Sequence, residues 1–232
     1  MEDARSPIDD FLLALTGKPR PRICFIPTPS GDSEEHLEKF YDAFDGRPCE
    51  PSHLAFFRKQ RPRSLPLPDY LEHLLAQDAI FVGGGNTRSA LAVWREWKLD
   101  AALRRAWSAG VLLSGMSAGA LCWFEVGVSD SFGDSRYRPL PALGFLRGAC
   151  AAHYNGAPDR RSSLHAFVEA GEISDTIAID DCAAVVFSDT AVERVVAWND
   201  GATAYRVFRE AGRVHEVAYS CERILTSPQS PR

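Results

Sequence analysis

Two glycine-rich segments, each directly after a short apolar run, constrain the fold of this 232-residue chain most strongly. The run at 78–82 (DAIFV) ends in GGGNT at 83–87, and the run at 111–114 (VLLS) ends in GMSAG at 115–119. A helical pattern follows each segment. Short apolar runs that stop at glycines and precede helices predict strand–turn–helix units. Repeated units of this kind predict a parallel sheet in which both glycine turns lie at the same edge.

Apolar runs and helical patterns alternate through the first half of the chain. Strands are expected at 22–27, 52–57, 78–82 and 111–114, and helices at 33–44, 71–75, 87–97, 100–109 and from 119 to about 125. After about residue 174 closely spaced β-branched runs take over, at 176–179, 183–188, 192–198, 204–208 and 213–219. We therefore predict a single α/β domain over 1–232. Its mostly parallel sheet is covered by helices on both faces and closed by a C-terminal antiparallel meander. The tails, about 1–19 and 226–232, are expected to be loosely ordered.

Composition narrows the class of partner. The chain is 45% apolar and 25% charged, as in ordinary soluble proteins, and its net charge of −5 provides no basic field for nucleic acid. No apolar stretch approaches the roughly 20 residues of a membrane span, and the N-terminus lacks the pattern of a signal peptide. Six scattered cysteines without metal-binding spacing indicate reduced thiols. We expect a cytoplasmic protein with no membrane or nucleic-acid partner and no metal or organic cofactor.

The GMSAG segment predicts a nucleophilic serine. It is a G-x-S-x-G sequence between a buried strand and a helix, where a sharp turn exposes the serine Oγ. Gly115 and Gly119 would relieve crowding at the turn, which makes Ser117 the candidate nucleophile. The amide of Ala118, at the start of the following helix, is a candidate oxyanion donor. The alternative is a small-residue turn that only packs a helix against a sheet.

The GGGNT segment is expected at the same sheet edge. Its bare glycine amides could supply a second oxyanion donor, from Gly84 or Gly85, and Asn86 is a candidate substrate contact. A phosphate-binding loop is the alternative, but the segment lacks both the lysine of a P-loop and the spacing of G-x-G-x-x-G.

A serine hydroxyl needs a general base. His153 is the one histidine at the mouth of a predicted strand after the serine, because the other five lie on helix patterns or in strands far from the glycine turns. A carboxylate must orient its imidazole. Position alone leaves four candidates for this acid: Asp130, Asp134, Asp180 and Asp181.

At these residues the sequence resembles the S51 peptidases, which are aspartyl dipeptidases of the peptidase E type with cyanophycinases as distant relatives. The resemblance runs from about residue 20 to 209. It rests on ordered segments, IPTPSGD at 26–32, FVGGGNT at 81–87, GMSAGALCWFE at 115–125, VSDSFG at 128–133, LGFLRG at 143–148 and HYNGAPDRR at 153–161. It implies a flavodoxin-like fold related to class I glutamine amidotransferases. It also implies Ser117 as nucleophile and His153 as base, with Asp181 favoured as the acid and Asp130 as the alternative.

The resemblance also implies a substrate. Relatives of the peptidase E type hydrolyse dipeptides with N-terminal aspartate, and an arginine beyond the catalytic histidine holds the aspartyl side chain. That arginine matches Arg160, with Arg161 adjacent. An arginine fork pairs a carboxylate through two parallel hydrogen bonds, which suits the role. We expect a short peptide as substrate and leave a homodimer open. The alternatives are a cyanophycinase-like or β-aspartyl peptide hydrolase, and a non-catalytic binding protein on the same fold.

Overall fold

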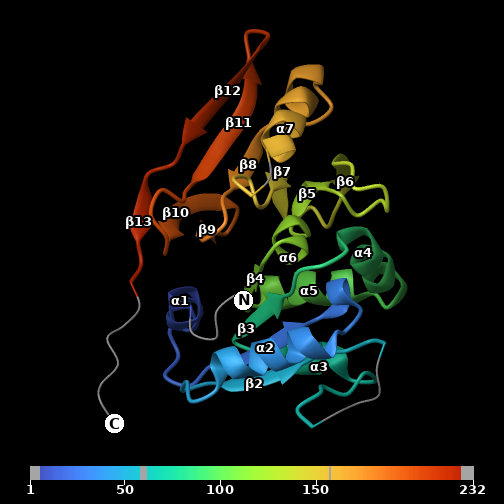
Figure 1. Ribbon diagram of the computed structural model, residues 1–232. Coiled ribbons are helices and arrows are strands. Elements are labelled where there is room, and N and C mark those ends of the chain that lie inside the picture. The colour runs from blue at the N-terminus through green and yellow to red at the C-terminus, as the bar shows by residue number, and fades with distance from the viewer. Residues whose placement is uncertain (1–5, 58–61, 157, 226–232) are drawn as a thin grey trace.

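A computed structural model describes residues 6–57, 62–156 and 158–225 (Figure 1). Its first sheet contains only parallel strands, in the order β2-β1-β3-β4. Their bounds are β1 (Arg22–Ile26), β2 (Glu50–His53), β3 (Ala79–Val82) and β4 (Leu112–Gly115). The strands β1 and β3 are almost wholly buried, as expected of parallel strands covered on both faces.

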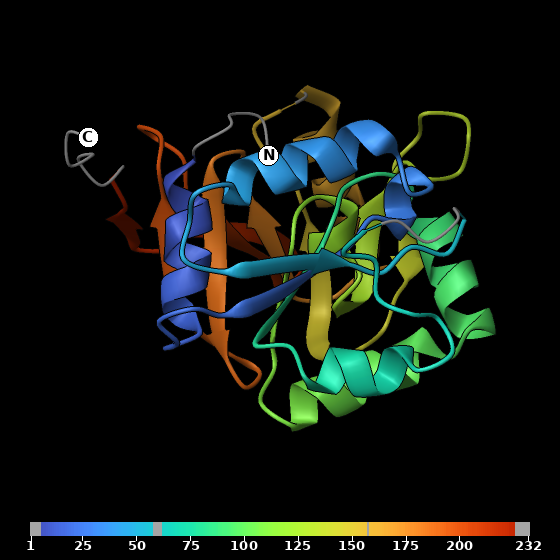
Figure 2. The ribbon, with the colours of Figure 1, turned by 90° about the horizontal axis from the view of Figure 1, so that it is seen from below.

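Helices cover both faces of this sheet (Figure 2). Ile23 and Phe25 of β1 pack toward α2 (Glu34–Phe44) and α1 (Pro7–Leu15). Cys24 and Ile26, which alternate with them along the strand, pack toward the opposite layer. That layer consists of α3 (Tyr70–Leu75), α4 (Thr87–Glu96) and α5 (Leu99–Ser108). A short 3-10 helix, η1 (Thr28–Ser30), follows β1.

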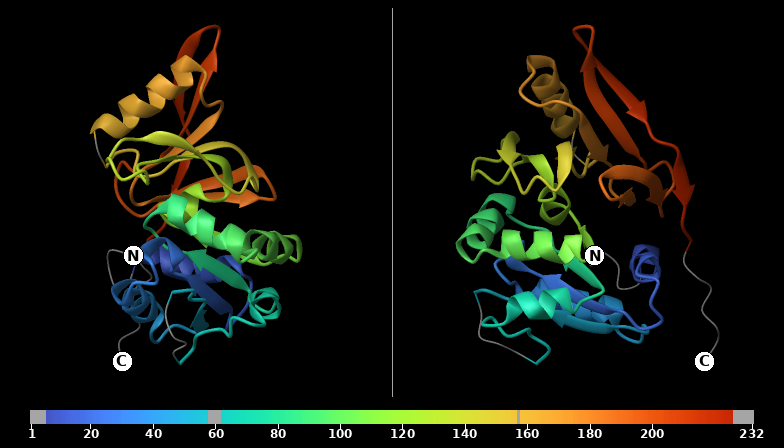
Figure 3. Two further views of the ribbon diagram at one scale, coloured as in Figure 1. Left: turned by 90° about the vertical axis from the view of Figure 1, so that its right-hand side faces the viewer. Right: turned by 180° about the vertical axis from the view of Figure 1, so that it is seen from behind.

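The second sheet has six strands in the order β12-β11-β8-β7-β5-β6. Their bounds are β5 (Phe124–Ser129), β6 (Arg138–Pro141), β7 (Leu146–Ala151), β8 (Thr176–Ile179), β11 (Ala204–Glu210) and β12 (Arg213–Ala218). The pairs β5–β7 and β7–β8 are parallel, whereas β6, β11 and β12 join antiparallel. The helix α7 (Pro158–Ala170) packs Leu164 and Val168 into the core of this sheet. The two sheets lie at opposite ends of the molecule, with α6 (Ala118–Leu121) between them (Figures 1 and 3).

A third, small sheet contains β9 (Ala183–Ser188), β10 (Ala191–Ala197) and β13 (Cys221–Arg223). The predicted α/β class, with helices on both faces of a parallel sheet, is confirmed. Two details differ from the prediction. The parallel strands divide between two sheets, and the C-terminal meander divides between the second and third. The helix expected from 119 to about 125 stops at Leu121, because the chain enters β5 at Phe124.

The expectation of a loose N-terminal tail over 1–19 is wrong for most of that range. Residues 7–15 form α1, and its Leu12 and Leu13 are buried in the cluster that contains Phe25. Arg47 further anchors the helix, since its Nε donates to Asp10 at 2.6 Å. Residues 1–5 and the expected tail at 226–232 lie outside the described residues.

Candidate active site

Ser117 lies in the turn between β4 and α6 and adopts a strained backbone conformation. Its φ of 53° and ψ of −117° fall in a region that non-glycine residues rarely occupy. Ala118 is the first residue of α6, where helix geometry leaves the amide without an intrahelical acceptor. Within the described part of the chain, Ser117 Oγ makes no hydrogen bond. The serine is therefore half-buried in a tight strand-to-helix turn, where it lines a cavity.

Close backbone packing explains the glycines around this turn. A Cβ on Gly119 would lie 2.2 Å from the Val82 carbonyl oxygen, and one on Gly115 would lie 2.3 Å from the Gly119 carbonyl oxygen. Only glycine permits these approaches. A Cβ on Gly84 would lie 3.3 Å from Ser117 Cβ, so the GGGNT segment lies directly beside the serine, as the parallel sheet required.

His153 follows β7 and is hydrogen-bonded to Asp181. Its Nδ1 lies 2.5 Å from Asp181 Oδ1, and the two side chains are 35% and 45% exposed. His153 has a φ of 55°, a second strained backbone at the same site. Asp181 follows β8, which is parallel to β7, so the histidine and the carboxylate leave the sheet at the same edge.

The other three acids have different surroundings. Asp180 is buried, and its Oδ2 accepts a hydrogen bond from the Thr203 amide at 3.1 Å. Burial raises the pKa of Asp180 above its ordinary value. Asp134 pairs with Arg138 in an exposed loop. Asp130 lines the same cavity as Ser117, but no hydrogen bond joins it to His153 among the described residues.

A cavity of about 250 Å³ connects these residues. Ser117, His153, Asp130 and Arg160 all line it. The remaining lining residues come from both glycine-rich segments, from α6 and β5, and from the position after β7: Gly85, Thr87, Ala118, Leu121, Val128, Ser129 and Ala152. The structure thus brings Gly85, Ser117, Asp130 and His153, which follow β3, β4, β5 and β7, to one cavity.

Two predicted substrate contacts have other partners. Asn86 is the N-cap of α4, where its side chain accepts from the Ser89 amide at 2.8 Å. Arg161 points to Glu216 of β12, donating from Nε to Oε2 at 3.1 Å. Neither residue lines the cavity that contains Ser117. Arg160 is therefore the arginine of this pair that faces the cavity.

Sequence reasoning missed the network around Glu216. Its Oε2 accepts from Tyr154 Oη at 2.5 Å and lies 2.8 Å from Nε2 of His165. Burial acts to raise the pKa of Glu216, but the hydrogen bonds from Tyr154, His165 and Arg161 outweigh it and hold that pKa below its ordinary value. Glu216 lies 55 residues beyond Arg161, and no local pattern links them.

Asn155 was also missed as a site residue. Its Oδ1 accepts a hydrogen bond from the Asp181 amide at 2.8 Å, which ties the Asp181 main chain to the turn after His153. Its place directly after the His153–Tyr154 pair in a glycine-containing turn was the available signal.

Cys122, one turn beyond Ser117, is not an alternative nucleophile. It is buried, and burial raises the pKa of its thiol well above the usual range. In the described part of the chain, no group of three or more histidine, cysteine or acidic side chains could hold a metal ion. None of the described helices is long and apolar enough to cross a membrane.

Comparison with known proteins identifies the family. The model of peptidase family S51 matches residues 1–195. The uncharacterized peptidase YgaJ of Bacillus subtilis (strain 168) is 41% identical over 217 residues, which cover 94% of this chain and 91% of that protein. The chain therefore belongs to peptidase family S51, and the resemblance stated from the sequence is confirmed.

Solved structures share the fold. A peptidase from an acI-B1 Actinobacterium superposes with a TM-score of 0.66 at 18% identity, covering 94% of this chain and 93% of that one. A protein from Listeria monocytogenes EGD-e, described as a candidate peptidase E, gives a TM-score of 0.55 at 16% identity, covering 91% and 93%. At these identities the likeness supports the fold alone.

Proposed function

We propose that this peptidase is a serine exopeptidase that hydrolyses dipeptides with N-terminal aspartate. The observation that carries the proposal is the hydrogen bond between His153 Nδ1 and Asp181 Oδ1, because His153 lines the same cavity as Ser117. Because Nδ1 faces Asp181, Nε2 is the ring nitrogen left to exchange a proton with the serine. A cavity of about 250 Å³ also suits a short peptide, since sites for drug-sized ligands occupy roughly 300–1,000 Å³.

In the proposed reaction, Ser117 Oγ attacks the scissile carbonyl carbon while His153 Nε2 takes the hydroxyl proton. The resulting oxyanion is held by the amides of Ala118 and of Gly84 or Gly85. The C–N bond then breaks, and His153 returns the proton to the leaving amine. Water, deprotonated by His153, hydrolyses the acyl-enzyme and releases aspartate. Asp181 orients the imidazole and stabilises its charged form.

Arg160 is the proposed recognition group for the substrate's aspartyl side chain. It lines the cavity and its Nη1 donates to the Ala152 carbonyl at 2.8 Å, directly before His153. Arg161 is tied to Glu216 and is not available for this role.

Hydrolysis of a dipeptide panel tests the proposal. Asp-Leu, Asn-Leu, Ala-Leu and β-Asp-Leu would be assayed with the wild-type protein and with Ser117→Ala. We expect Asp-Leu to be the best substrate and its cleavage to be abolished in the variant. Preference for β-Asp-Leu would instead support the β-aspartyl hydrolase, and no cleavage by folded wild-type protein would support the binding protein.

A matched pair of substitutions tests the choice of acid. Asp181→Asn is expected to lower kcat by roughly 10²- to 10⁴-fold, because the imidazole loses the partner that fixes its orientation. Asp130→Asn, in the same cavity, is expected to leave kcat near the wild-type value. The reverse ranking would overturn the assignment of Asp181.

A further inference from the structure

We propose that Tyr137 is a specificity-positioning residue, which holds the guanidinium of Arg160 in place to receive the substrate's carboxylate. The proposal rests on the function proposed above and extends it to a residue outside the cavity. Tyr137 precedes β6, whereas Arg160 lies in the first turn of α7, and the two belong to segments that only the tertiary fold brings together.

The contact between the two side chains is a cation–π interaction. Arg160 Cζ lies 4.4 Å from the centroid of the Tyr137 ring. A guanidinium over an aromatic face is attracted by the negative charge density of the ring, and the stack restricts the plane of the arginine fork. Without it, the long side chain of Arg160 would occupy several rotamers and would lose that freedom on binding.

The remaining contacts of Arg160 determine which edge of the fork is free. Nη1 is occupied by the Ala152 carbonyl, and Nε is covered without a hydrogen-bond partner. Among the described residues nothing accepts a hydrogen bond from Nη2. Because Arg160 lines the cavity of Ser117, the orientation set by Tyr137 and Ala152 presents Nη2 to a ligand there.

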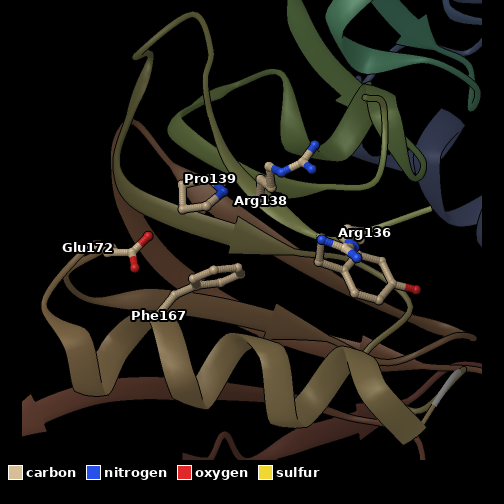
Figure 4. A pocket seen from close by; sticks show the side chains of 6 residues that line it. Arg136, Arg138, Pro139, Phe167 and Glu172 are labelled. Carbon is tan, nitrogen blue, oxygen red and sulfur yellow. The ribbon is translucent and has the colours of Figure 1, made fainter. Parts of the chain in front are cut away.

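Tyr137 also lines a second depression, which shares no lining residue with the catalytic cavity. This groove lies between β6 and α7, where Pro139 and Phe167 face each other across it (Figure 4). Tyr137 lines this groove. Its ring stacks against the guanidinium of Arg160, which lines the catalytic cavity. Phe167 lines the same groove, but no described guanidinium lies over its ring. It therefore provides a matched control for loss of an aromatic ring.

The prediction distinguishes positioning from general structural support. Tyr137→Leu should raise KM for Asp-Leu about tenfold, as expected for loss of a half-buried cation–π contact, and leave kcat nearly unchanged. It should leave the KM for Asn-Leu unaltered, because asparagine offers Arg160 no side-chain carboxylate. Tyr137→Phe keeps the ring and should behave like wild type, as should Phe167→Leu.

The experiment measures kcat and KM for Asp-Leu and Asn-Leu with the wild type, Tyr137→Leu, Tyr137→Phe, Phe167→Leu and Arg160→Met. Tyr137→Met provides a second ring-removing variant if the leucine protein does not fold. If wild type does not prefer Asp-Leu to Asn-Leu, the proposed function and the role of Tyr137 both fail. If wild type prefers Asp-Leu and Arg160→Met loses that preference while the ring-removing variants keep it, only the role of Tyr137 is overturned. If removal of the ring changed KM equally for Asp-Leu and Asn-Leu, Tyr137 would have only a structural role, and the proposal would also be overturned.

Discussion

The two sheets contribute to the candidate site in different ways. The parallel sheet supplies Ser117 and the glycine amides through backbone conformation, at turns defined by contiguous segments of sequence. The second, mixed sheet and its helix α7 supply His153, Asp181 and Arg160, which are held by side-chain hydrogen bonds between separate elements. The first contribution depends on close packing of main chain against main chain, whereas the second depends on hydrogen bonds and charge. The two regions should therefore respond differently to substitution.

The largest effect on stability is expected in the half of the molecule built on the parallel sheet, which we call the parallel half. Gly119→Ala would place a Cβ 2.2 Å from the Val82 carbonyl oxygen, so the turn must move away from β3. In a helix, alanine is normally more stable than glycine. Here we expect the overlap to lower the free energy of unfolding by roughly 3 kcal/mol. Chemical denaturation measures this free energy in the variant and the wild type. Gly110→Ala is the comparison for backbone strain alone, because nothing lies within 4 Å of that Cβ and only the positive φ of 89° opposes the substitution. If Gly119→Ala cost no more than Gly110→Ala, the backbone-packing account of the first region would fail.

A smaller effect on stability is expected in the half built on the six-stranded sheet of parallel and antiparallel strands. Glu216→Gln removes the charge that pairs with Arg161, and the glutamate side chain is only 15% exposed. We expect a loss of about 2 kcal/mol at pH 7. Since the folded-state pKa of Glu216 is lowered, the stabilisation is present above the unfolded-state pKa and disappears as pH falls through the folded value.

Thermal unfolding of Glu216→Gln and wild type at pH 7 and at low pH would measure this difference. Glu172 is an exposed glutamate just after α7, and Glu172→Gln is the control that should change stability little. A gap between Glu216→Gln and wild type that stayed constant down to acid pH would contradict the electrostatic role of Glu216.

The smallest effect is expected at Asp9, an electrostatic exception in the parallel half. Burial raises the pKa of Asp9 to about 6, although Arg47 lies 3.6 Å away and acts in the opposite direction. A raised folded-state pKa means that wild-type stability falls as pH rises from about 4 to above 6. Asp9→Asn should therefore stabilise the protein at pH 8 by about 1 kcal/mol and make no difference at pH 4.

Denaturation midpoints of wild type, Asp9→Asn and Asp10→Asn at both pH values test this expectation. Asp10 is half exposed and bonded to Arg47 at 2.6 Å, so its substitution should not stabilise. If Asp9→Asn destabilised the protein at pH 8, the attraction between Asp9 and Arg47 would be larger than the cost of burying the Asp9 charge, and the prediction would be wrong.

The sequence by itself determined the α/β class, the glycine turns and the positions of Ser117, Gly84 and His153. Each of these depends on local information, namely apolar runs, glycines at strand ends and one histidine after a strand. Only the tertiary structure decided that Asp181, among four carboxylates, contacts His153, and that Arg160 faces the cavity while Arg161 pairs with Glu216. The physical reason is that hydrogen bonds and ion pairs depend on distances of a few ångströms between elements distant in the chain. Adjacent residues such as Asp180 and Asp181 carry identical chemistry and differ only in the direction in which the backbone points them.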